Sequence, residues 1–176
     1  YNNVGYVLFL QGKTADAKAK FEKANSVQEN PQSLNNLGVI AHIGGDREKA
    51  KELYGQAVSA GPEVKYNMGI ANIQDGKYED AISNFGGEKT FNKALAQVLA
   101  GNLDAASTTL DGSEAKDEAM TYYLRAIIAS RKGNESAVVD NLKSAFGKDA
   151  SLKAKAAQDR EFVKYFESAN FLAIVK

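Results

Sequence analysis

The sequence lacks cysteine altogether and contains only two prolines and one histidine. Without cysteine the chain forms no disulfide, no thiolate metal site and no cysteine nucleophile. A lone His42 also excludes metal sites built from a pair of histidines. The prolines are confined to Pro31 and Pro62, alanine and lysine are abundant, and β-branched runs are scarce, which favours helix.

A surplus of charge is missing too, because 22 basic residues balance 22 acidic ones. Nucleic-acid binding needs an excess of Lys and Arg on one face, so we predict no nucleic-acid partner. The longest apolar run, from Val7 to Leu10, is far too short to span a bilayer, and we predict no direct membrane insertion. The 44% of hydrophobic residues in 176 suits a globular protein with one real core.

A glycine turn recurs between helix-like segments, 25 to 33 residues apart, at Gly12, Gly45, Gly76, Gly101 and Gly133. Seven residues before each turn glycine stands a small residue: Gly5, Gly38, Gly69, Ala94 and Ala126. Nine residues after it stands a large apolar one: Phe21, Tyr54, Phe85, Leu110 and Leu142. Such repeats indicate one structural unit used five times.

This pattern resembles the tetratricopeptide repeat family, whose unit is about 34 residues long. The resemblance implies an all-α fold, a right-handed superhelix (α-solenoid) of about five helix-turn-helix repeats. The units would cover residues 1–30, 31–62, 63–87, 88–119 and 120–150. Residues 151–176 are similar to the short helical caps that close some bacterial arrays, and we expect them to cover the last apolar face.

Each unit is then predicted to be two antiparallel helices joined at the glycine. Glycine suits the turn because the residue past a helix end often takes a left-handed conformation. We expect the small residues to mark close approach of the two helices, and the large ones to fill the space between one unit and the next.

The sequence gives little support for a catalytic function. Gly12-Lys13-Thr14 lacks the upstream glycine of a phosphate-binding loop, since Val7 stands there. Most carboxylates, such as Asp46 and Asp104, fall in the first turn after a glycine, where they cap a helix. We therefore expect no enzyme and no cofactor.

Asparagine recurs two residues before the small position, at Asn3, Asn36, Asn67 and Asn92. In the tetratricopeptide family that position often hydrogen-bonds a bound peptide, and asparagine offers both donor and acceptor. The resemblance predicts a partner-binding groove lined by Asn3, Tyr6, Asn36, His42, Tyr66, Asn67, Ile70, Phe91, Asn92 and Tyr123. Two alternatives stay open: the asparagines tie adjacent helices together, and His42 is structural.

Some family members grip a C-terminal carboxylate with Lys and Arg beside these asparagines. Here the residues one before and three after each of these asparagines are uncharged, among them Asn2, Tyr6, Asn35 and Tyr66. We therefore predict no carboxylate clamp.

The leading functional expectation is a scaffold that holds a protein or peptide segment in its inner curve. The alternative is a structural spacer in a larger bacterial envelope protein, with no groove ligand. Because the repeat pattern is already under way at Tyr1, we expect further repeats or domains upstream. The missing cysteine and the closing element resemble periplasmic or outer-membrane-associated proteins, with the cytoplasm as the alternative.

Overall fold

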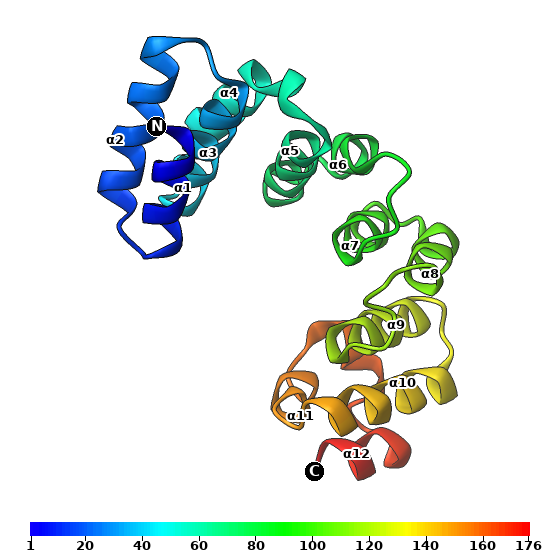
Figure 1. The fold of residues 1–176 in the computed structure, drawn as a ribbon. Helices are drawn as coiled ribbons and strands as arrows, with labels where there is room; N and C mark the ends of the chain where they lie inside the picture. The colour runs from blue at the N-terminus through cyan, green and yellow to red at the C-terminus, as the bar shows by residue number, and fades with distance from the viewer. The chain divides into compact units, whose positions relative to one another are not determined.

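The structure, a computed structural model, describes residues 1–176 and is built of helices without a strand (Figure 1). It divides into two compact units, Tyr1–Gly86 and Gly87–Lys176. The first unit contains three helix pairs. These are α1 (Asn2–Leu10) with α2 (Thr14–Val27), α3 (Pro31–Ile43) with α4 (Arg47–Gln56), and α5 (Pro62–Gln74) with α6 (Tyr78–Phe85). A 3₁₀ turn, η1 (Val58–Ala60), follows α4.

The second unit contains two further pairs and a closing segment. The pairs are α7 (Phe91–Leu99) with α8 (Leu103–Asp111), and α9 (Ala119–Arg131) with α10 (Glu135–Lys148). The closing segment consists of α11 (Leu152–Ala156), the 3₁₀ helix η2 (Arg160–Tyr165) and α12 (Ala169–Val175). The predicted all-α fold of helix pairs is confirmed. No helix has the length and apolar character needed to cross a membrane.

The five turns share one backbone geometry. The turn glycines have positive φ angles: 75° at Gly12, 85° at Gly45, 75° at Gly76, 86° at Gly101 and 78° at Gly133. After Gly12, the backbone N–H of Lys13 donates to the carbonyl of Leu8, while that of Gly12 donates to Phe9. The same pair of bonds recurs at the other four turns. This is a Schellman motif, which closes the first helix and leaves the chain antiparallel to it.

The helices of a pair approach closely where the small residue faces the large one. A Cβ built on Gly38 would lie 2.5 Å from Tyr54 Cε1, and one on Gly69 would lie 2.6 Å from Phe85 Cε1. Gly5 meets Phe21 in the same way. The three glycines therefore mark the close approach of the two helices of a pair, as expected. Phe21 also lies in the core shared with the next helix pair, where it clusters with Leu34 and Leu37.

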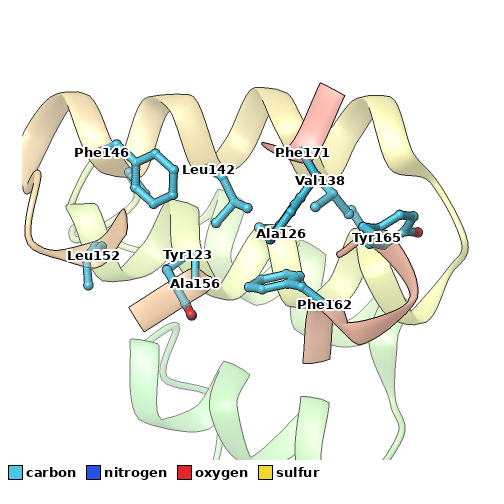
Figure 2. Packing of buried hydrophobic residues seen from close by; sticks show 12 residues of the cluster. Tyr123, Ala126, Val138, Leu142, Phe146, Leu152, Ala156, Phe162, Tyr165 and Phe171 are labelled. Carbon is cyan, nitrogen blue, oxygen red and sulfur yellow. The ribbon is translucent and has the colours of Figure 1, made fainter. Parts of the chain in front are cut away.

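The closing segment completes the core of the last repeat. Figure 2 shows side chains of α9 and α10 meeting those of the closing segment in one cluster. The Phe162 ring is fully buried, with its centroid 5.6 Å from that of Tyr123 and 5.9 Å from that of Phe171. Arg131 Nη2 pairs with Glu161 at 2.6 Å, which adds a charged tie between α9 and η2. The segment thus covers an apolar surface that the last repeat could not bury by itself.

Candidate partner-binding surface

Charge is divided sharply between the two helices of the first two pairs of the first unit. Helices α1 and α3 contain no Asp, Glu, Lys or Arg, and α5 contains only Glu63 and Lys65, near its start. The second helices carry the charge instead, with Asp16, Lys18, Lys20, Glu22 and Lys23 in α2 and Arg47, Glu48, Lys49, Lys51 and Glu52 in α4. Solvation of this unit therefore rests mainly on α2 and α4.

The outward side of the first helices is an uncharged surface. Residues two before, one after and five after the packing glycine point away from the second helix, because each residue turns an α-helix by about 100°. We call this surface the first-helix face; it comprises Asn3, Tyr6, Leu10, Asn36, Val39, Ile43, Asn67, Ile70 and Gln74. Tyr6 is 51% exposed, Leu10 68% and Ile43 70%. Side chains of this kind are usually covered when they lie close together.

Asparagines link the first helices to one another. Asn36 Nδ2 donates to Asn2 Oδ1 at 3.2 Å, and Asn67 Nδ2 donates to Asn35 Oδ1 at 3.0 Å. Ser33 Oγ also donates to Asn2 Oδ1, at 2.9 Å. The structure therefore supports the helix-tying alternative for Asn36 and Asn67. Neither Oδ1 of these two receives a hydrogen bond from the chain, so both remain able to accept one from a partner.

The link between α3 and α5 predicts a measurable stability loss. Asn67→Ala removes the donor and leaves Oδ1 of the buried Asn35 without its partner. We expect the free energy of unfolding to fall by about 1 kcal/mol, measured by urea denaturation. Replacing both asparagines by leucine removes donor and acceptor together and should cost less than the two single changes combined. Strictly additive costs would show that the bond contributes nothing.

An ion cluster lies at the opposite layer, where the second repeat meets the third. Lys51 Nζ lies 2.6 Å from Asp75 Oδ2 and 3.0 Å from Glu48 Oε1, and Arg47 approaches Asp75 at 3.8 Å. The hydrogen bond from Lys51 lowers the pKa of the Asp75 carboxyl below its ordinary value. The bonds to Asp75 and Glu48 raise the pKa of Lys51.

These pKa shifts predict an acid-dependent part of the stability. The pKa of the Asp75 carboxyl is lower in the folded state than in the unfolded state, where it is about 3.9. The carboxylate therefore contributes its full stabilisation above the unfolded-state pKa, and this stabilisation is lost as the pH falls through the folded-state pKa. Urea unfolding at several pH values should show wild type more stable than Asp75→Asn by a constant amount from pH 7 to about pH 5, and the difference should shrink below about pH 4. A difference that stays constant down to pH 2 would contradict this assignment.

Comparison with known proteins matches one helix pair to a repeat family and the whole chain to a known fold. Residues 31–63, which contain α3 and α4, match the tetratricopeptide repeat family model. Across 88% of this chain and 90% of the other, the fold matches YrrB, described as a TPR protein with an unusual peptide-binding site, with a TM-score of 0.72 at 18% identity. A tetratricopeptide repeat protein from Parabacteroides merdae matches over 98% of this chain and 74% of its own, with a TM-score of 0.68 at 21% identity. No curated protein matches the sequence.

The second helix pair matches the tetratricopeptide repeat family by its own sequence, and the chain as a whole has the fold of tetratricopeptide repeat proteins. The fold follows from the glycine turns and the small-large pairs already described. The family of the second repeat follows from the match of residues 31–63 to the family model. The identities to the two solved structures are low enough that they show the fold alone. What this chain binds must therefore be argued from its own surface.

His42 and Tyr66, two residues predicted to contact a partner, make intramolecular contacts in the structure. His42 Nε2 lies 2.9 Å from Gln74 Oε1, so this histidine links α3 to α5. Tyr66 packs edge-on against Phe85, with ring centroids 5.2 Å apart. Both side chains are half-buried and keep one side open to solvent.

Tyr123 is not part of an exposed surface, contrary to the sequence-based expectation. It is 1% exposed and belongs to the core closed by residues 152–171. Its hydroxyl donates to Asp159 Oδ2 at 2.8 Å, and Lys155 Nζ lies 4.9 Å from the centre of its ring. Burial and the bond to Asp159 raise the pKa of Tyr123. Phe91 and Asn92 lie on α7 in the second unit, both half-buried, and Phe91 packs against the core of that unit.

Leu10 and Ile43 are the functional candidates that the sequence reasoning missed. They are among the most exposed large apolar side chains of the chain. Each stands five residues after the packing glycine, at the same position of its repeat. An apolar residue at this position, on a helix without charged residues, could have been recognised in the sequence as a candidate for partner contact.

Proposed function

We propose that this chain is a protein-interaction scaffold that binds a partner segment along the first-helix face. The observation that carries the proposal is the division of charge, which leaves exposed Tyr6, Leu10 and Ile43 on helices without a single charged residue. An apolar surface kept open beside a highly charged layer is typical of a surface that another protein covers.

The chemistry of the face suggests the kind of segment it binds. The apolar side chains provide buried area, and the free Oδ1 atoms of Asn36 and Asn67 accept backbone N–H groups. An extended or helical segment that presents apolar side chains to one side fits these features. The lack of basic residues on the face disfavours an acidic segment there.

The likeness to YrrB supports the proposal in a general way. That protein is described as having a peptide-binding site, and it shares the fold over most of both chains. The proposal for this chain nevertheless depends on its own exposed residues.

Peptides selected from a random display library on the immobilised chain provide the test. Ile43→Asp places a charge on the face at the end of α3. We expect it to weaken the binding of the selected peptides by more than about tenfold, because an unpaired carboxylate would be desolvated. Val27→Asp is the matched control, since Val27 is 65% exposed but lies on α2. Calorimetric titration of each variant measures the change. Peptides that bind Ile43→Asp as tightly as wild type, or lose equal affinity on Val27→Asp, would place the site elsewhere.

The spacer function remains the second candidate. The hydrogen bonds between Asn2 and Asn36 and between Asn35 and Asn67 favour it, because they stiffen the stack without any ligand. A spacer predicts that selection yields no peptide whose binding depends on Ile43.

A further inference from the structure

The ion cluster at Asp75 is one of several equivalent positions between neighbouring repeats. Lys51 stands six residues after the turn glycine of its repeat, and Asp75 stands directly before the turn glycine of the next one. The lysine therefore reaches from a second helix to the following turn, where it binds a carboxylate at 2.6 Å.

Where the first repeat meets the second, the lysine is present but the carboxylate is missing. Lys18 is the residue six after Gly12, and Gly44 takes the place that Asp75 has in the next repeat. The one ion pair of Lys18 is with Glu22, at 3.9 Å, and both side chains are more than half exposed. Lys18 thus lacks the close anion that Lys51 has.

A cavity of about 320 Å³ lies at this place. Lys18 and Gly44 form part of its wall, and Leu37, Ile40 and Leu53 supply apolar surface. A cavity of about 380 Å³ occupies the equivalent place between α8, α9 and α10. There Ser107 stands at the lysine position and Lys132 directly before the turn glycine, so that cavity does not offer the same chemistry.

The other charged groups in the wall of the first cavity are Glu22, which is the distant partner of Lys18, and Asp46 and Lys49, which have close local partners. Asp46 Oδ1 accepts the backbone N–H of Lys49 at 3.1 Å, which caps α4. Lys49 Nζ pairs with Glu52 at 2.9 Å. Lys18 is therefore the cation best placed to take an added carboxylate.

We propose that this cavity is a second docking site, which takes an acidic residue and an adjacent apolar residue of a partner protein. The carboxylate would bind Lys18 as Asp75 binds Lys51, and the apolar side chain would lie against Leu37 and Leu53. The site lies between α2, α3 and α4, and none of the residues that line it belongs to the first-helix face, so it does not depend on binding there.

Two blocked dipeptides test the chemistry directly: N-acetyl-leucyl-aspartate amide and its neutral match, N-acetyl-leucyl-asparagine amide. Backbone NMR shifts of the full chain should move at Gly44 and Lys18 on titration with the acidic dipeptide. Its dissociation constant should be about fivefold lower than that of the neutral one, as expected for one partly exposed ion pair. Equal constants for the two dipeptides would overturn the proposal.

Three variants sharpen the test. Gly44→Asp supplies the carboxylate from within the chain, and the φ of −73° at this glycine permits a side chain. We expect it to abolish the shifts from both dipeptides. Lys18→Gln should leave the neutral dipeptide unchanged and remove the preference for the acidic one. Lys51→Gln, the control, should alter neither. A preference for the acidic dipeptide that survives Lys18→Gln would refute the assignment.

Discussion

Replacing Phe162 by alanine is expected to lower the free energy of unfolding of the second unit by about 3–5 kcal/mol. The ring is fully buried, and it contacts the rings of both Tyr123 and Phe171. Its removal leaves a cavity between the last repeat and the closing segment. Because helices α9 and α10 cannot bury their apolar surface alone, the loss should spread to both.

Hydrogen exchange resolved along the chain measures this effect. Protection should fall in α9, α10 and the closing segment, while α1 to α4 keep theirs. Val163→Ala is the matched control, because Val163 is the next residue and is 62% exposed; its cost should stay within about 0.5 kcal/mol. A Phe162→Ala chain with full protection in α10 would show that the closing segment does not support the last repeat.

Gly38→Ala is expected to destabilise the first unit by about 1–3 kcal/mol, and Tyr54→Leu is expected to recover much of that loss when combined with it. The added methyl would lie 2.5 Å from Tyr54 Cε1. Leucine is smaller than tyrosine, and the chain already uses the pairs Ala94 with Leu110 and Ala126 with Leu142 at the equivalent positions, all of them fully buried.

A double-mutant cycle measured by urea unfolding tests this pairing. The two changes should couple favourably by about 1–2 kcal/mol. Gly55→Ala is the control, since Gly55 lies inside α4 and a Cβ there meets nothing within 4 Å; it should raise stability by about 0.5–1 kcal/mol. Additive costs for Gly38→Ala and Tyr54→Leu would mean that the two residues do not constrain each other.

The repeat architecture was predictable because its signals are local. A turn glycine such as Gly45 and a small-large pair such as Gly38 and Tyr54 lie within one helix pair, so their spacing reports the geometry directly. The positive φ angles and the close contacts of these residues follow from that spacing.

The candidate site was less predictable, because it depends on contacts between elements. Tyr123 has the sequence position of an exposed residue, but the closing segment returns 36 residues later and places Asp159 on its hydroxyl. Likewise, Asn36 occupies a family ligand position, yet only the distance between α1 and α3 shows that its amide binds Asn2. The division into two compact units at Gly86 and Gly87 also has no periodic signal.

The central claim is that a partner segment binds the uncharged first-helix face. Chemical-shift mapping of a library-selected peptide on the isotope-labelled chain tests it most directly. We predict that the largest shifts cluster at Tyr6, Leu10, Ile43 and Ile70, with α2 and α4 little affected. Shifts concentrated on α2 and α4, with the first-helix face unchanged, would contradict the claim.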